Sequence, residues 1–201
     1  MRGYLHRPHG RTMGALVLTH GAGGNSAMPL LVAAAEAFAH AGFAVLRYDL
    51  PFRQKRARGG PSRGDAERDR AGLKDAVRAL GVLEPGRVFL GGQSYGGRQA
   101  SMLAAEDPAV AEALVLLSYP LHPPGKPAQL RTQHFPALRT PSLFVHGARD
   151  PFATAEELRA ALALIPARTE LSEIEGAGHD LARGRFDLKR LLVEPFLKLL
   201  S

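Results

Sequence analysis

The segment "RVFLGGQSYGGRQA" (residues 87–100) places a single serine, Ser94, among glycines, between a strand-like stretch and a helix-forming one. The apolar run 88–90 predicts a buried strand, and residues 98–100 favour a helix. Within the segment, Gly92-Gln93-Ser94-Tyr95-Gly96 has the form G-x-S-x-G. Small residues two positions before and after the serine allow a sharp strand-to-helix turn that exposes the hydroxyl. The alternative is that these glycines only let a helix pack closely against a strand.

Strand-like and helix-like segments alternate along the chain on both sides of residues 87–100. Strands are predicted at 15–20, 43–49, 87–92, 112–119, 141–147 and 168–176, and helices at 25–42, 65–80, 95–107, 154–165 and 185–200. The apolar runs are continuous, which is typical of parallel strands covered on both faces. The pattern therefore predicts an α/β fold: a doubly wound, mostly parallel sheet with helices on both faces. Residues 2–7 are a candidate antiparallel edge strand, and Pro195 is expected to bend or break the last helix.

The length and composition are those of one globular domain. The chain has 201 residues, 45% of them hydrophobic and 22% charged, without an internal repeat or linker, so a single domain is expected over 1–201. No apolar run has the length of a signal peptide or a membrane span, so the expected location is cytoplasmic, with no membrane partner. The absence of cysteine excludes disulfides, thiolate metal sites and cysteine nucleophiles.

The formal net charge of +7 raises the question of an anionic partner. Its densest source is "FRQKRARGGPSRG" (52–64), which has five basic residues and no acidic one. A basic run without a nucleic-acid-binding motif is ordinarily solvated surface, so no nucleic-acid partner is expected. The alternative is that the loop binds an anionic substrate or an acidic macromolecule.

Two further polar residues follow predicted strands. Asp150 lies in "GARDPF" after strand 141–147, and His179 lies in "GAGHDL" after strand 168–176. Ligands of such sheets bind beyond the carboxyl ends of the strands. The order Ser94, Asp150, His179 is that of nucleophile, acid and base in one class of serine hydrolases. We expect His179 to accept the Ser94 proton and Asp150 to orient the imidazole.

Each of these residues also has a simpler interpretation. Asp150 precedes a proline and is a common kind of turn or helix cap. His179 taken alone is an ordinary loop histidine. Asp180 is a competing acid, but a neighbour in sequence is poorly placed to reach the far side of the His179 ring. The occurrence of three such residues, each at a strand end and in this order, favours a catalytic triad.

The motif "HGAGGNS" (20–26) follows the first strong strand. A tetrahedral oxyanion needs two amide donors, and we assign them to Ala22 in this loop and to Tyr95 after the serine. His20 is expected to brace the loop. A rival interpretation is a dinucleotide-binding fingerprint with Asp49 closing the next strand. The sequence departs from that fingerprint at the third glycine position, which Ser26 occupies. This interpretation also leaves Ser94, Asp150 and His179 unexplained.

Together, "HGAGGNS", "RYDLPF", "GGQSYGG", "YPLHPPGKP", "LFVHGARDPF" and "GAGHDL" resemble the α/β-hydrolase superfamily over nearly the whole chain. More narrowly, they look like a small uncapped branch that is loosely grouped with dienelactone-hydrolase-like proteins. Dienelactone hydrolases have cysteine where this chain has Ser94, so their substrate is not carried over. Eukaryotic relatives of the branch include subunits of a chromatin-acetylating complex.

The resemblance implies the triad Ser94, Asp150 and His179 and oxyanion amides at Ala22 and Tyr95. We therefore expect a serine hydrolase that needs no cofactor or metal and cleaves short carboxylic esters or thioesters through an acyl-enzyme. The basic loop 52–64 leaves open that the substrate is anionic. The alternative is a binding or scaffold protein with this fold.

Residues 120–140 are too few for a packed cap, so we expect an open, shallow site. The expected substrate contacts are Tyr119, Leu121, His122 and Arg53, the last because the loop 52–64 leaves a strand end beside the site.

Overall fold

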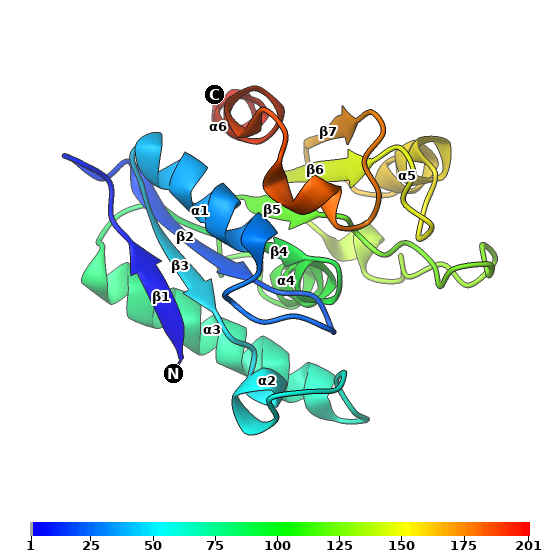
Figure 1. The fold of residues 1–201 in the computed structure, drawn as a ribbon, viewed down its shortest axis with the longest axis horizontal. Coiled ribbons are helices and arrows are strands. Elements are labelled where there is room, and N and C mark those ends of the chain that lie inside the picture. Colours follow the sequence, from blue (N-terminus) through cyan, green and yellow to red (C-terminus); the bar gives the residue numbers. More distant parts are fainter. Residues whose placement is uncertain (1) are drawn as a thin grey trace.

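The computed structural model describes residues 2–201 and is built around one seven-stranded sheet. The strand order is β1-β3-β2-β4-β5-β6-β7 (Figure 1). The strands are β1 (Gly3–His6), β2 (Gly14–Thr19), β3 (Phe43–Tyr48), β4 (Val88–Gln93), β5 (Leu114–Leu117), β6 (Ser142–Gly147) and β7 (Thr169–Ile174). Strands β2 to β7 pair in parallel, and β1 pairs antiparallel with β3. The predicted α/β sheet and its antiparallel edge strand are confirmed.

Helices cover both faces of this sheet. They are α1 (Pro29–His40), α2 (Pro51–Lys55), α3 (Asp65–Leu83), α4 (Tyr95–Glu106), α5 (Ala155–Leu162) and α6 (Glu194–Leu200). A short 3₁₀ turn lies at Phe135–Ala137, a tight turn with left-handed residues at Leu181–Gly184, and a π-helical turn at Lys189–Val193 precedes α6.

The core is divided by the sheet into two apolar layers. Successive side chains of a strand point to opposite faces, so Val17 faces one layer and Leu16 the other. The first layer packs against α3, α4 and α5, and the second against α1 and α6. Every side chain of β2 is buried. This double coverage explains why the strands are continuous apolar runs in the sequence.

Local signals set the helix ends. Helix α1 begins with Pro29, whose fixed φ suits the first helical turn, and the chain leaves it at Gly42, which has a φ of +95°. Helix α5 begins with a capping box, in which Thr154 and Glu157 each accept a hydrogen bond from the other's backbone amide.

Two elements differ from the sequence expectation. Helix α2 begins at Pro51 and extends to Lys55, into the segment 52–64 that was expected to be entirely loop, and Phe52 anchors it in the core. The last helix, expected over 185–200 with a bend or break at Pro195, instead begins at Lys189, and the irregularity is a π-helical turn that ends at Val193, just before α6. Proline has no N–H and crowds the carbonyl four residues earlier, so a wider turn relieves the clash.

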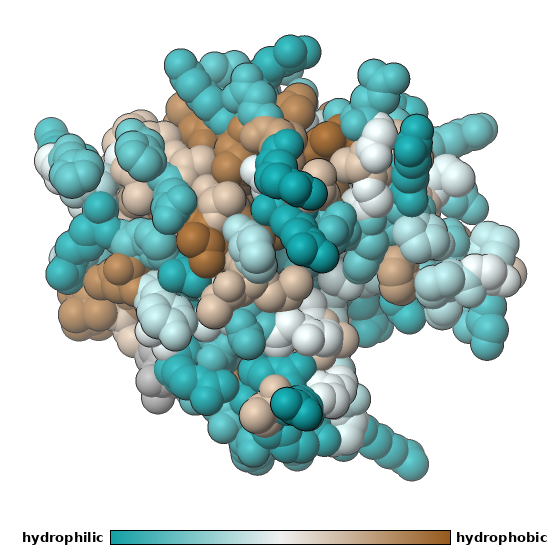
Figure 2. Space-filling model, viewed as in Figure 1, coloured by the Kyte–Doolittle hydropathy of each residue, from teal (hydrophilic) through white to brown (hydrophobic). Residues whose placement is uncertain are grey.

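The connection between β5 and β6 contains only the short turn Phe135–Ala137, so within residues 2–201 no inserted helical segment covers the carboxyl ends of the strands as a cap. In the view of Figure 2, apolar atoms gather over α1 and α6, whereas the surface over α2 and the loop after it is mainly hydrophilic. Within residues 2–201, no helix combines the length and apolar character needed to cross a membrane.

Candidate active site

Ser94 lies on the tight turn that joins β4 to α4. Its φ of 51° and ψ of −117° are strained for a residue with a side chain. The turn also needs glycines on either side: a Cβ on Gly92 would lie 2.9 Å from the carbonyl carbon of Gly96, and a Cβ on Gly96 would lie 2.5 Å from the His20 oxygen. The glycines therefore permit the close packing that holds the serine up, and the two sequence interpretations are parts of one arrangement.

The three residues proposed as a triad meet at this turn. His179 Nε2 lies 2.9 Å from Ser94 Oγ, and His179 Nδ1 lies 2.8 Å from Asp150 Oδ2. The Asp150 side chain is fully buried, whereas that of His179 is 26% exposed. A buried carboxylate on one ring nitrogen favours a proton there and leaves the other nitrogen free to accept one from Ser94.

The loop after β6 sets the position of Asp150. Its Oδ1 accepts the Phe152 N–H at 2.9 Å, while its own N–H donates to the Gly147 oxygen. Asp180, the competing acid, is oriented differently. Its half-exposed carboxylate accepts the Ala182 N–H and lies 3.6 Å from Arg183 Nε.

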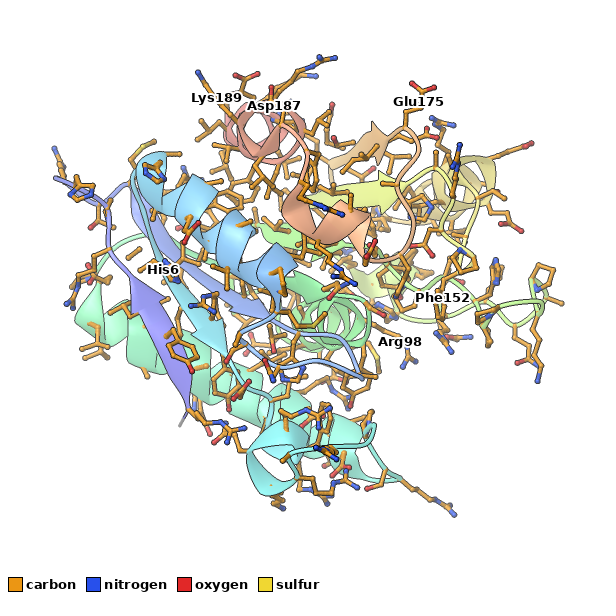
Figure 3. All side chains as sticks on the ribbon, in the orientation of Figure 1. His6, Arg98, Phe152, Glu175, Asp187 and Lys189 are labelled. Atoms are coloured by element: carbon orange, nitrogen blue, oxygen red, sulfur yellow. The ribbon has the colours of Figure 1, made fainter. Side chains whose placement is uncertain are left out.

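Two neighbours of His179 were not anticipated from the sequence. Phe152, which is labelled in Figure 3, lies against the imidazole, with ring centroids 4.2 Å apart and planes at 31°. The buried Gln93 donates from Nε2 to the His179 carbonyl at 3.3 Å. The only sequence signal was adjacency, since Phe152 is two residues from Asp150 and Gln93 precedes Ser94. Adjacency does not reveal which way a side chain points.

The loop 20–26 runs beside the serine as a glycine-rich turn. The Gly21 oxygen accepts the Gly24 N–H at 3.1 Å and lies 2.9 Å from His20 Nδ1. His20 Nε2 accepts the Leu50 N–H, so Nδ1 is the protonated nitrogen and donates to Gly21. Burial lowers the pKa of His20, which keeps the ring neutral. His20 braces the loop in the manner expected from the sequence.

Tyr95, the first residue of α4, has an N–H without a partner inside the helix. Its side chain points away from the serine, and its hydroxyl donates to Asp69 Oδ2 at 2.8 Å. Burial, followed by the nearby Asp69 carboxylate, raises the pKa of Tyr95. Burial raises the pKa of Asp69 as well. The side chain thus anchors the start of α4 to α3 while the amide stays at the helix end.

The cavity at Ser94 has a volume of about 380 Å³. Its lining comes from the loop 21–24, the turn between β4 and α4 that contains Ser94, and the loops after β6 and β7. Met28 and Phe152 are its largest apolar side chains. No residue of the basic segment 52–64 lines it.

The four expected substrate contacts are also outside this lining. Tyr119, Leu121 and His122 are buried, and the Tyr119 hydroxyl donates to the Arg131 carbonyl. The sequence placed their backbone near the site, but core packing turns these side chains inward.

Arg53 is only 3% exposed and points behind the loop 20–26. Its guanidinium donates to the carbonyls of Ala22, Gly24, Arg56 and Gly59. Asp49, the acidic residue of the dinucleotide alternative, is also engaged, accepting from the Ser26 N–H and from Arg2.

A mostly parallel sheet without a cap, with a serine on a strained turn beside a histidine and a buried aspartate, defines the uncapped class of α/β-hydrolase folds. The family model for the alpha/beta hydrolase domain matches residues 12–189. The chain therefore belongs to the α/β-hydrolase family.

Solved structures with the same fold include three from bacteria. Est1E from Butyrivibrio proteoclasticus, with ferulic acid bound, is 20% identical with a TM-score of 0.76, over 99% of this chain and 94% of that one. Dienelactone hydrolase from Anabaena variabilis is 24% identical with a TM-score of 0.72, over 98% and 88%. A serine hydrolase without a lid from Xanthomonas campestris is 16% identical with a TM-score of 0.74, over 96% and 87%. At these identities the likeness concerns the fold.

Proposed function

We propose that the protein is a serine hydrolase that cleaves short carboxylic esters or thioesters through an acyl-enzyme formed on Ser94. The observation that supports this most directly is the continuous hydrogen-bonded chain from Ser94 through His179 to Asp150. A nucleophile within hydrogen-bond distance of a base, and a base oriented by a third group, are the geometric requirements for such catalysis.

In this mechanism Ser94 Oγ attacks the carbonyl carbon of the substrate while His179 Nε2 takes the hydroxyl proton. Asp150, buried on the other side of the ring, stabilises the imidazolium that results. His179 then protonates the departing alcohol or thiol, and an acyl-enzyme remains. A water molecule, deprotonated by the same nitrogen, releases the acid and restores Ser94.

The negative charge of each tetrahedral intermediate develops on the former carbonyl oxygen. The backbone amides of Ala22 and Tyr95 are the donors that we assign to it. Ala22 and Ser94 line the same cavity, and the amide of Tyr95 is at the N-terminus of α4. Preorganised donors of this kind contribute about 10²- to 10³-fold each to the rate.

The cavity favours small substrates. Its volume of about 380 Å³ and its walls of Met28 and Phe152 suit a short apolar acyl or alcohol group. The absence of a cap leaves the remainder of a substrate in solvent.

The test is reaction with a fluorophosphonate probe and hydrolysis of p-nitrophenyl esters and acyl thioesters of graded length. We expect the wild type to be labelled and to prefer short chains, and Ser94→Ala to lose both labelling and turnover by at least about 10³-fold. Absence of labelling in a folded wild type would contradict the proposal and favour a scaffold role.

A further inference from the structure

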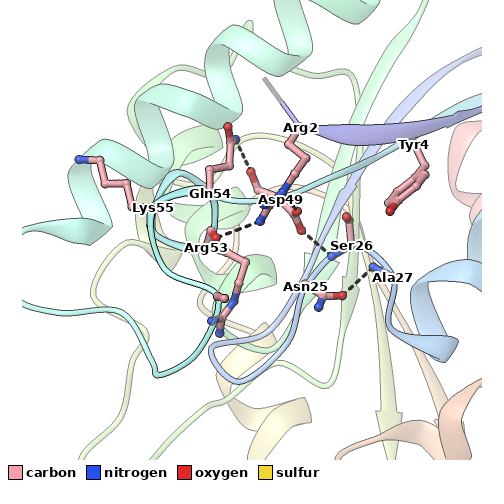
Figure 4. A pocket seen from close by; sticks show the side chains of 10 residues that line it. Arg2, Tyr4, Asn25, Ser26, Ala27, Asp49, Arg53, Gln54 and Lys55 are labelled. Carbon is pink, nitrogen blue, oxygen red and sulfur yellow. Dashed lines mark hydrogen bonds and ion pairs between the residues drawn. The ribbon is translucent and has the colours of Figure 1, made fainter.

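The buried Arg53 is the side chain that links the loop beside Ser94 to the basic loop after α2. Its Nε donates to the Gly24 oxygen at 2.7 Å and its Nη2 to the Ala22 oxygen at 3.0 Å. On the other side, Nη1 donates to the Arg56 oxygen at 3.1 Å and Nη2 to the Gly59 oxygen at 2.8 Å. In Figure 4 the guanidinium lies between these two loops.

The bonds to Ala22 and Gly24 matter because this loop has little rigidity of its own. Residues 21, 23 and 24 are all glycine, which loses more conformational entropy on ordering than any other residue. A donor that keeps one conformation of such a loop therefore determines where its amides point. The guanidinium is suited to this task because it is planar and has five donors in a fixed arrangement.

The two peptide planes that flank Ala22 are each held by a side chain. His20 holds the Gly21 carbonyl, which belongs to the same plane as the Ala22 N–H and points the opposite way. Arg53 holds the Ala22 carbonyl, which belongs to the following plane. With both planes held, φ and ψ of Ala22 are determined, and with them the direction of its N–H.

The guanidinium of Arg53 forms no ion pair with a carboxylate of the described residues. No acidic oxygen of the described residues lies within 4 Å of its guanidinium, although the side chain is almost fully buried. Burying a cation without a counter-ion is costly, and here four carbonyl dipoles take the place of a carboxylate. Its carbon Cζ also lies 5.0 Å from the centre of the Phe52 ring. An arginine kept under these conditions, on four carbonyls and an aromatic ring, is suited to fixing backbone geometry rather than to pairing charge.

We propose that Arg53 is a positioning residue of the oxyanion site: it holds the loop 21–24 in the conformation in which the Ala22 amide faces the reacting carbonyl. The inference rests on the proposed function and deepens it. Arg53 acts through the Ala22 backbone and does not touch substrate, so its contribution belongs to the transition state and is independent of the charge of the substrate.

The kinetic test compares Arg53→Met and Arg53→Lys with Arg58→Met, an exposed arginine of the same segment, as the control. We expect Arg53→Met to lower kcat about 10- to 100-fold with KM changed less than about 3-fold, equally for neutral and anionic esters. The kcat of Arg53→Lys, whose ammonium is a single compact donor group, should lie between those of Arg53→Met and the wild type. A selective rise in KM for anionic esters would overturn the proposal in favour of direct substrate binding, and an unchanged kcat would overturn it outright.

A chemical-rescue experiment addresses the alternative that Arg53→Met merely folds poorly. Arg53 and Arg2 are among the residues that line a cavity of about 500 Å³ (Figure 4). Millimolar guanidinium ion should therefore reach the vacated position in Arg53→Ala and raise its kcat several-fold, without stimulating the wild type or Arg58→Ala. No rescue in a folded Arg53→Ala variant would count against the proposal.

Amide hydrogen exchange separates this inference from the proposed function. Exchange in the segment 21–24 should accelerate about 10-fold in Arg53→Met and not in Arg58→Met, whether or not the protein turns over an ester. Unchanged exchange would refute the positioning role of Arg53 even if Ser94 is an active nucleophile. Accelerated exchange in a protein that fluorophosphonate does not label would support the positioning role and contradict the proposed hydrolase activity.

Discussion

The environment of His179 depends on contacts from several parts of the chain. Asp150 holds one ring nitrogen, Phe152 covers a ring face, and Gln93 holds the backbone carbonyl. The side chain is still 26% exposed, so these contacts restrict an imidazole that would otherwise rotate in solvent. A candidate base that has to face both Ser94 and Asp150 benefits from this restriction, because in enzymes a misplacement of about 1 Å can lower the rate about 10²-fold.

Phe152→Ala tests the value of the stacked ring. The amide of residue 152, which donates to Asp150, is retained, so the change removes the ring alone. We expect kcat for a short ester to fall about 10-fold, because the imidazole is less well oriented, while the fold is kept. Phe152→Leu, which preserves apolar bulk, should show a smaller loss of kcat than Phe152→Ala. Full activity in Phe152→Ala would show that the other contacts suffice to orient His179.

The turn Leu181–Gly184, which follows His179 and Asp180, is a left-handed element. Leu181, Ala182 and Arg183 have φ values of 45°, 49° and 56°, although none is glycine. A left-handed residue with a side chain costs roughly 1–2 kcal/mol. The turn is held by the fully buried Leu181 and by the close approach of Gly184 to Ala33 and Leu30 of α1. Packing of this segment therefore offsets backbone strain directly after the candidate base.

Arg183→Gly is expected to stabilise the protein. Glycine adopts this φ without strain, so the free energy of unfolding should rise by up to about 1 kcal/mol, less what the exposed contact with Asp180 contributes. Arg185→Gly is the matched control: that residue is also exposed but has a φ of −83°, and it should be neutral or destabilising. Urea unfolding of the two variants measures the difference, and equal effects would argue against strain at position 183.

The stability of the whole molecule should depend on pH through histidines whose burial lowers their pKa, the half-buried His134 above all. Burial, and then the positive charges of Arg98 and Arg70, lower the pKa of His134 to about 4. Its Nε2 lies 2.8 Å from Ser101 Oγ, between α4 and the turn Phe135–Ala137. The unfolded chain, with a pKa of 6.5, binds a proton that the folded protein resists. The stabilising contribution is therefore complete above pH 6.5 and is lost as the pH falls toward 4.

His134→Gln should reduce this acid sensitivity. Urea midpoints measured from pH 7 to pH 4 should fall less steeply in the variant than in the wild type. Part of the slope should remain, because burial also lowers the pKa of His20. Parallel slopes for the two proteins would show that His134 is protonated as readily in the folded state as in the unfolded one.

The sequence alone was sufficient for the α/β sheet, its antiparallel edge strand, the absence of a cap and the residues that gather at the strand ends. These features depend on local information: apolar periodicity, glycine spacing and the order of polar residues after strands. The sequence also indicated that His20 braces the loop 20–26, because the motif "HGAGGNS" is short and contiguous. The short helix α2 was missed, and the irregularity expected at Pro195 takes a π-helical form that the sequence did not predict, since both depend on how a proline is accommodated in a packed layer.

Only the tertiary structure decided which way the side chains point. Arg53, Tyr119, Leu121 and His122 follow strand ends, yet all four turn into the protein, whereas Phe152 turns toward His179. Position along the chain limits where a backbone can be, but the direction of a side chain is set by the free energy of burying it against residues distant in sequence. For Arg53 those distant partners are the carbonyls of Ala22 and Gly24, about 30 residues away, in a loop whose conformation has no side-chain pattern to reveal it.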